Sequence, residues 1–180
     1  TAKNREYMAK IYNEDTTQIE WMGWLVPSEY EEPHNQAPYT TTLIFNCGLG
    51  PSNGYDYLNA GAYFTGRVDE IEILTNCLKL IYTDTLAAGN RPDLRVAIGV
   101  AETNMTTAMT TGPLELAFVD QEKYIREDGT VWSAQAVIRD IITSYGARIL
   151  MGVSGWWIVR IRDYALFYDG YQIPYQLYTE

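Results

Sequence analysis

The chain is poor in the residues that most often build catalytic and metal centres. It has one histidine, His34, and two cysteines, Cys47 and Cys77, among 180 residues. A single histidine excludes a histidine metal cluster, and a Ser-His-Asp triad could use only His34. That residue lies in a proline-containing loop, without a Gly-x-Ser-x-Gly elbow, and is interpreted as a surface residue. Neither cysteine belongs to a Cys-x-x-Cys pair, so both are interpreted as small buried hydrophobic residues, with one bridge between them left open.

Positive charge is also scarce. The chain has 13 Lys and Arg against 23 Asp and Glu, a formal net charge of −10 that repels phosphate backbones and anionic membranes. Without a basic stripe interleaved with aromatics, sequence-specific nucleic-acid binding is not expected. There is no signal peptide and no run of 18 apolar residues, so nothing in the sequence marks secretion or membrane insertion. The chain begins Thr-Ala-Lys-Asn, without an initiator methionine, and is expected to be an internal fragment of a longer polypeptide.

The common ligand-binding loops are missing too. The glycine-rich segment from Gly48 to Gly54 has no following Lys-Ser or Lys-Thr, so it is interpreted as a connector. The segment from Glu127 to Thr130 lacks the alternating ligands of a calcium loop and is interpreted as a tight turn. Two carboxylates suffice for glycoside hydrolysis, but most acids here are interpreted as solvated. No catalytic, metal-binding or cofactor-binding residue is assigned, and no cofactor is expected. The clustered carboxylates are Glu29, Glu31, Glu32, Asp69, Glu70, Glu72, Asp120, Glu122, Glu127 and Asp128.

Aromatic residues are abundant instead, with 15 tyrosines and 5 tryptophans. Tyrosine favours strands and also interfaces, where the ring is buried while the hydroxyl stays in water. Four of the tryptophans lie on expected strands, which favours core and interface positions over a ligand platform. An exposed, coplanar row of these rings would instead indicate a sugar-binding surface. The four are Trp21, Trp24, Trp156 and Trp157.

Alternating apolar residues predict mostly strands, with a first hairpin over residues 7–26 and a second near the C-terminus. Apolar residues on both faces of Gln18–Val26 predict a strand buried on both sides. The expected strands are Tyr7–Tyr12, Gln18–Val26, Tyr39–Asn46, Leu94–Val100, Arg148–Val153, Trp156–Arg162 and Ala165–Tyr178. The expected connections are Pro27–Pro38, Cys47–Gly66 and Glu102–Gly112.

Two amphipathic helices are predicted. The first spans Val68–Tyr82, with Thr65 as its N-cap. The second is capped by Ser133 and ends at Gly146, a residue that accepts the left-handed conformation of a helix stop. The buried positions expected at helical spacing are Ile71, Leu74, Leu78 and Ile81 in the first, and Val137, Ile138, Ile141, Ile142 and Tyr145 in the second.

These elements predict a strand-dominated α+β fold, with antiparallel sheets or a partial barrel and two amphipathic helices. Two lobes are expected: residues 1–64 form a β-rich, barrel-like lobe, and residues 65–180 form a mixed α/β lobe that ends in a β-hairpin.

The order of four stretches resembles an internal region of bacteriophage and prophage tail proteins of the tail-hub, or tail-tip, kind. The resemblance covers residues 20–162 and rests on motif order. Two positions depart from the family pattern: Cys47 stands where an Asp precedes Gly-Leu-Gly, and Tyr145 replaces the usual Phe. The stretches are WMGWLVPSEYEEP, APYTTTLIFNCGLG, YFTGRVDEIEILTNCLKLI and LELAFVDQEKYIREDGTVWSAQAVIRDIITSYGARILMGVSGWWIVRI.

The resemblance implies a non-enzymatic virion structural protein at the tail tip, present in the host cytoplasm before assembly. Such proteins join the tail tube and tape measure to spike, fibre or receptor-binding subunits, and the full-length parent would form a trimeric ring. The isolated chain is expected to be monomeric or weakly self-associating, with an apolar, tyrosine-rich patch around Tyr164 to Tyr178. A carbohydrate-binding module, or the binding lobe of a cell-wall glycoside hydrolase, is the alternative.

Overall fold

A computed structural model describes the chain in nine segments and shows a strand-dominated α+β fold. The strands form four small sheets, and none of the sheets in the described segments closes into a barrel. The predicted loop at Pro27–Pro38, with His34, lies outside the described residues, as does most of the predicted loop at Glu102–Gly112. The division at residue 64 stays a prediction. The described residues are 7–12, 14, 19–26, 42–50, 54–82, 93–96, 112–152, 155–161 and 176–178.

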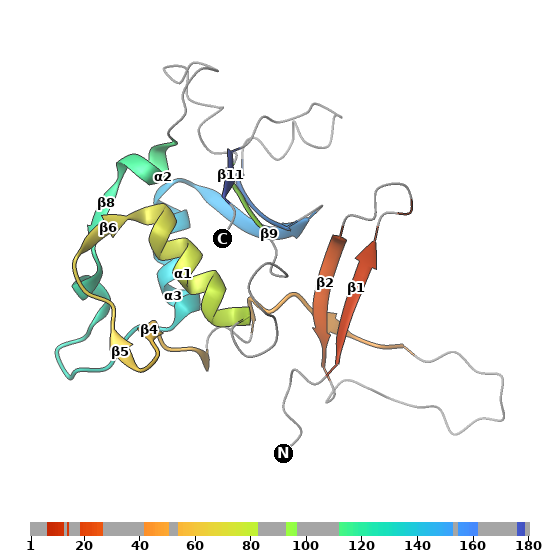
Figure 1. Cartoon of the computed structure of the whole chain (residues 1–180), viewed down its shortest axis with the longest axis horizontal. Helices are drawn as coiled ribbons and strands as arrows, with labels where there is room; N and C mark the ends of the chain where they lie inside the picture. The colour runs from red at the N-terminus through yellow and green to blue at the C-terminus, as the bar shows by residue number, and fades with distance from the viewer. Residues whose placement is uncertain are drawn as a thin grey trace.

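The first sheet is antiparallel and contains β1 (Met8–Tyr12), β2 (Ile19–Leu25) and β3 (Phe45–Asn46), in that order. The N-terminal hairpin predicted from the sequence is therefore confirmed. The strand expected to begin at Tyr39 is shorter, because only its last two residues pair with β2 in the described part. The pair of long strands projects away from the helices, as Figure 1 shows.

The second sheet has four strands: β7 (Asp93–Val96), β9 (Ala147–Gly152), β10 (Gly155–Arg160) and β11 (Gln176–Tyr178). Their order is β11-β7-β10-β9, and β10 runs parallel to β7 but antiparallel to β9. The predicted C-terminal hairpin is confirmed as β9 and β10.

Helix α1 (Glu70–Tyr82) begins later than predicted, and Thr65 is not its N-cap. Residues Arg67–Asp69 form strand β6, which pairs with β8 (Phe118–Asp120). The cap is supplied by Asp69, whose Oδ1 accepts a hydrogen bond of 2.8 Å from the backbone N–H of Glu72. The pairing with a strand some fifty positions along the chain holds these residues extended, although their local sequence fits a helix.

Helix α3 (Ala134–Ser144) matches its prediction closely. Ser133 Oγ accepts a hydrogen bond of 3.3 Å from the backbone N–H of Ala136, and Gly146 adopts a φ of +58° at the helix end. Of the five positions of this helix predicted to be buried, three are buried, while Ile142 and Tyr145 are half-buried.

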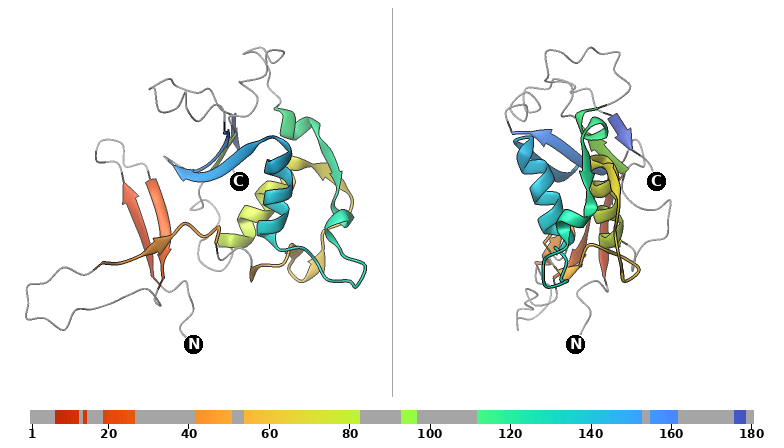
Figure 2. Two further views of the ribbon diagram at one scale, coloured as in Figure 1. Left: turned by 180° about the vertical axis from the view of Figure 1, so that it is seen from behind. Right: turned by 90° about the vertical axis from the view of Figure 1, so that its left-hand side faces the viewer.

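Several short elements were not expected. The connection predicted over Cys47–Gly66 contains a two-stranded hairpin of β4 (Leu58–Asn59) and β5 (Ala62–Tyr63). A single turn of helix α2 (Pro113–Leu116) and a 3-10 turn, η4 (Gln121–Tyr124), flank β8. Figure 2 shows these pieces wrapped around the outer side of the two helices.

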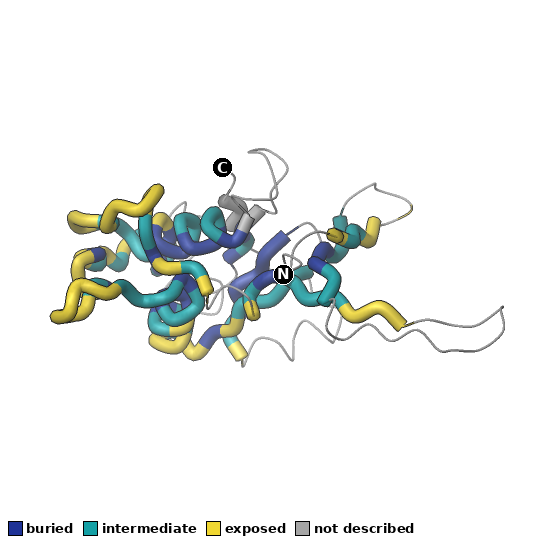
Figure 3. The backbone as a smooth tube through the Cα atoms, turned by 90° about the horizontal axis from the view of Figure 1, so that it is seen from below, coloured by how far each residue is buried: buried dark blue, intermediate teal, exposed yellow. Residues whose placement is uncertain are grey.

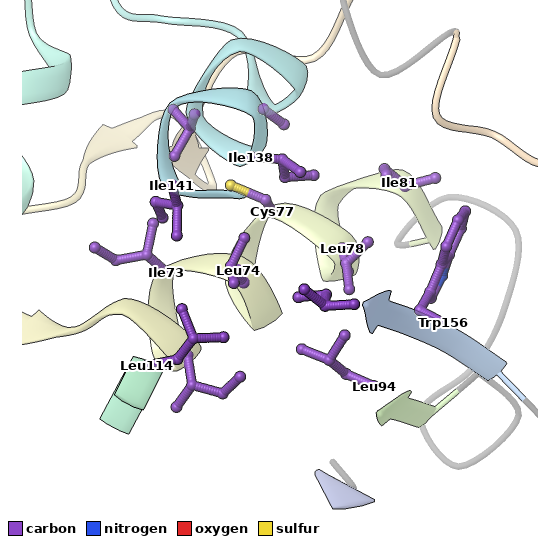
Figure 4. Close-up of a cluster of buried hydrophobic side chains, with 14 of the residues drawn as sticks. Ile73, Leu74, Cys77, Leu78, Ile81, Leu94, Leu114, Ile138, Ile141 and Trp156 are labelled. Atoms are coloured by element: carbon purple, nitrogen blue, oxygen red, sulfur yellow. The ribbon is translucent and has the colours of Figure 1, made fainter. Parts of the chain in front are cut away.

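The core lies between the two helices and the second sheet. Ile73 and Cys77 of α1 face Ile141 of α3, while Leu94 and Trp156 come from the sheet (Figure 4). The predicted apolar face of α1 is confirmed, since all four of its predicted positions are buried. Met22 and Trp24 of β2 belong to the same core, so one face of the first sheet is fixed to the body of the protein.

Candidate interaction surface

Three of the described carboxylates that could have formed an acid-base pair serve as caps or turn residues, namely Asp69, Asp120 and Asp128. Asp69 caps α1, and Asp120 Oδ1 caps η4 by accepting from the backbone N–H of Glu122 at 3.1 Å. Within the described segments, no group of three or more His, Cys, Asp and Glu side chains could hold a metal ion. The candidates Glu29, Glu31 and Glu32 lie outside those segments.

The segment from Glu127 to Thr130 forms the predicted tight turn. Asp128 Oδ1 accepts hydrogen bonds from the hydroxyl of Thr130 at 2.7 Å and from its backbone N–H at 2.9 Å. Both bonds hold the pKa of Asp128 below its usual value, and the bond from the hydroxyl has the larger effect. Gly129 has a φ of +78°, which glycine adopts without strain. The carboxylate stabilises the turn.

A buried aromatic cluster joins the β4–β5 hairpin to η4. The Tyr57 ring stacks on Phe64 with centroids 4.4 Å apart and meets the edge of Tyr124 at 5.7 Å. The Tyr57 hydroxyl donates a hydrogen bond of 2.6 Å to Oε1 of Gln121, a buried polar side chain that donates in turn to the carbonyl of Thr65. Burial raises the pKa of Tyr57, so the phenol stays protonated and donating.

Two further tyrosines tie α3 to its neighbours. The Tyr124 hydroxyl donates to Oδ2 of Asp140 at 3.3 Å, and Lys123 forms an ion pair of 2.8 Å with the same oxygen. The Tyr145 hydroxyl donates to Oε2 of Glu70 on α1 at 2.5 Å. Burial, followed by the adjacent carboxylate, raises the pKa of both phenols. These polar contacts join helices to one another.

The cysteines are free thiols. Cys77 is fully buried in the core, as predicted, and this burial raises the pKa of its thiol well above the usual value. Cys47 is half-buried just after β3, so its predicted burial is only partly correct.

The four tryptophans do not form an exposed row. Trp24, Trp156 and Trp157 are buried, and only Trp21 is half-exposed. The Trp21 ring lies over Gly23, where a Cβ atom would come within 2.2 Å of the ring. It also meets the edge of Phe45 on β3, with centroids 6.4 Å apart. Trp21 is therefore part of a continuous apolar surface on the first sheet.

This surface is the outer face of the first sheet, defined here by Tyr7, Ile11, Trp21, Leu25 and Phe45. The register places Ile11 opposite Trp21 and Leu25 opposite Phe45, so each pair shares a face. Tyr7 joins them because its carbonyl accepts a hydrogen bond from the N–H of Leu25 at 2.9 Å. Because side chains alternate along β2, Met22 and Trp24 point the opposite way, into the core.

The outer face is open to solvent. Tyr7 is 62% exposed and Ile11 is 53% exposed, and the other three side chains are half-buried. None of the five is charged. An antiparallel sheet with one face in the core usually presents polar residues on the other, so this arrangement is typical of a contact surface. In Figure 3 the described residues at this end of the molecule are a mixture of exposed, intermediate and buried positions.

This face is only partly predictable from the sequence. The prediction that Gln18–Val26 is buried on both sides is correct for the face of Met22 and Trp24. It is only partly correct for the other face, where Gly23 is buried but Trp21 and Leu25 are half-buried. The apolar patch expected around Tyr164 to Tyr178 falls largely outside the described residues, where only the β11 backbone is placed.

Comparison of the chain with protein-family models, with curated proteins and with solved structures gives no significant match. Among the described residues, no helix is both long enough and apolar enough to cross a membrane.

Proposed function

We propose that this chain is a non-enzymatic structural component of a phage or prophage tail tip or hub, joining the tail tube to spike or receptor-binding parts. The observation that carries the proposal is the apolar outer face of the first sheet. Its aromatic and aliphatic side chains lie on a sheet whose other face packs in the core. Covering these side chains with a partner would remove apolar surface from water, which is favourable. A structural protein that assembles with other subunits would bind them through such an apolar face.

The polar side chains support the same proposal. In the described segments, the carboxylates considered as catalytic candidates include Asp69 and Asp120, which cap helical turns, and Asp128, which holds a β-turn. The buried phenol of Tyr57 donates a hydrogen bond to Gln121. Titratable groups that support catalysis are usually gathered in a cleft, with perturbed pKa values and open to substrate. The raised pKa values here belong to buried and half-buried side chains inside the fold.

The proposed partners are other tail proteins: tube, tape-measure, spike or fibre subunits, with the full-length parent in a trimeric ring. The proposed location is the virion tail tip, preceded by the host cytoplasm. The order of sequence motifs suggests these partners, and the net charge of −10 is compatible with them, since an acidic ring would let DNA pass without binding it.

The carbohydrate-binding alternative is less favoured by the geometry. A sugar platform needs aromatic rings that present their faces to solvent, and three of the four candidate tryptophans are buried. Trp21, the remaining one, lies against Gly23 and Phe45.

Immunogold labelling of particles released by the organism that encodes the chain tests the proposal. Antibodies raised against the chain should decorate the end of the tail in negatively stained particles. Labelling of the capsid, or particles that lack the protein altogether, would contradict it. A peptide-blocked serum serves as the control.

The proposal also predicts that the purified chain does not hydrolyse peptidoglycan or chitin oligomers. Product release can be followed by chromatography over long incubations. Turnover that disappears when one carboxylate is changed to its amide would show an active site and exclude a purely structural role.

A further inference from the structure

We infer that the chain has a second interaction surface, which binds a segment of another protein that carries lysine or arginine beside large apolar residues. The surface is the solvent-facing side of the two-stranded ribbon of β6 and β8, together with the last residue of α2. This ribbon face consists of Arg67, Asp69, Leu116, Phe118 and Asp120. The inference goes beyond the proposed function, because it names the chemistry of a partner and does not require that partner to be a tail protein.

The strand register sets which side chains of the ribbon face solvent. Val68 pairs with Val119, and both pack against the core, so the residues on either side of them point away from it. Phe118 and its cross-strand partner Asp69 therefore point outward together. Residues directly opposite each other in an antiparallel pair have Cβ atoms about 4.5–5.5 Å apart. A carboxylate and a large apolar ring are thus neighbours on the ribbon face.

The apolar side chains of the ribbon face are open to solvent. Phe118 is 53% exposed, and Leu116, two residues earlier at the end of α2, is 57% exposed. The guanidinium carbon of Arg67 lies 5.8 Å from the centre of the Phe118 ring, a distance at which the ring attracts a cation. The ring therefore offers a partner both apolar area and attraction for positive charge.

Negative charge dominates the segments that carry the ribbon face. Their two cations already have partners inside the chain: Arg67 lies over Phe118, and Lys123 forms an ion pair of 2.8 Å with Asp140 on α3. This excess of carboxylates attracts a positively charged partner and repels a second copy of the acidic chain. The acids of β6, β8, η4, α2 and the first turn of α1 are Asp69, Glu70, Glu72, Glu115, Asp120 and Glu122.

The mixture of apolar and anionic side chains specifies a partner that has both kinds of complement. A purely apolar partner would take the carboxylates of Asp69 and Asp120 out of water without giving them a cation, which is costly. A purely basic partner would leave Phe118 and Leu116 in water. A segment with lysine or arginine beside leucine or an aromatic residue matches both. The outer face of the first sheet, which is uncharged, lies at the other end of the molecule in Figure 1, so the two surfaces can bind different partners.

Fluorescence anisotropy of labelled peptides mixed with the whole chain tests the inference. The probe is a peptide in which lysine alternates with leucine, and its dissociation constant should lie between about 10 µM and about 1 mM, the range of weak complexes. One reference peptide has serine in place of every leucine, and the other has glutamate in place of every lysine. Each should bind at least about tenfold more weakly, because the first lacks the apolar contact and the second is repelled. Added salt should weaken binding of the probe.

A first pair of substitutions locates the apolar contact. Phe118→Ala should weaken binding of the lysine–leucine peptide by about tenfold, since exposed aromatic side chains often carry much of the binding energy of a surface. Tyr12→Ala is the matched control, because it removes another aromatic ring that is 53% exposed, on the first sheet. It should leave the affinity unchanged.

A second pair of substitutions tests the carboxylates. Asp69→Asn combined with Asp120→Asn removes two charges but keeps the caps of α1 and η4, because asparagine caps helices about as well as aspartate. This variant should also bind the peptide about tenfold more weakly. Glu14→Gln combined with Glu127→Gln is the control, since it removes the same charge from two exposed positions outside the ribbon face. Equal circular dichroism spectra and melting temperatures would show that all four variants fold.

The inference is overturned if the lysine–leucine peptide does not bind at about 1 mM, the weak end of specific association. It is also overturned if the lysine–serine peptide binds equally well, because the attraction would then be one of charge alone. Equal losses of affinity in each variant and its control would place the binding elsewhere on the chain and overturn it as well.

Discussion

Replacing Ile141 by alanine should lower the free energy of unfolding by about 2–5 kcal/mol, as large-to-small changes in protein cores do. Ile141 is 2% exposed and points from α3 toward Ile73 and Cys77 of α1 (Figure 4). The shortened side chain would leave a cavity between two helices that are joined by the hydrogen bond from Tyr145 to Glu70. Urea denaturation followed by circular dichroism measures the change.

Arg139→Ala is the matched control on the same helix. Arg139 is exposed, and alanine is a better helix former, so the free energy of unfolding should stay within about 0.5 kcal/mol of the parent value. Equal, small shifts for both variants would contradict the orientation of α3.

Replacing Trp156 by alanine should be at least as costly, about 3–5 kcal/mol. Trp156 is fully buried on the central strand β10, where it pairs with Leu94 of β7 and Met151 of β9. Its ring lies beside Leu78 and Ile81 at the end of α1 (Figure 4). Removing it opens the contact between the sheet and α1, so the loss should appear in both the urea midpoint and the melting temperature.

The same substitution at Trp21 provides the comparison. Trp21 is half-exposed on the outer face and contacts Phe45 through a ring edge, so Trp21→Ala should cost clearly less than Trp156→Ala. A larger loss at Trp21 would mean that the outer face is part of the folded core and not a surface for partners.

The sequence predicted the elements whose signals are local. Helix α3 has its cap at Ser133, its apolar stripe and its stop at Gly146 within fifteen residues, and all three appear in the structure. The two hairpins were likewise predicted, because alternating apolar residues flank short turns.

Elements that depend on distant partners could not be predicted in the same way. The local sequence of Arg67–Asp69 fits the start of a helix, but in the structure these residues pair with β8 as a strand. The helix therefore begins later, with Asp69 and not Thr65 as its cap. The mixed second sheet places β7 beside β10 in parallel, a choice that no local pattern encodes. Likewise, the sequence shows that Gln18–Val26 is apolar on both faces but not which face meets the core.

The proposed tail assembly requires that the outer face be covered by a partner. Hydroxyl-radical footprinting, read by mass spectrometry, can compare the purified chain with the same protein in intact particles. Tyr7, Ile11 and Trp21 should be oxidised in the free chain and protected in the particle, while the buried Trp156 should stay unreactive in both. Oxidation of the three outer-face residues to the same extent in chain and particle would contradict it.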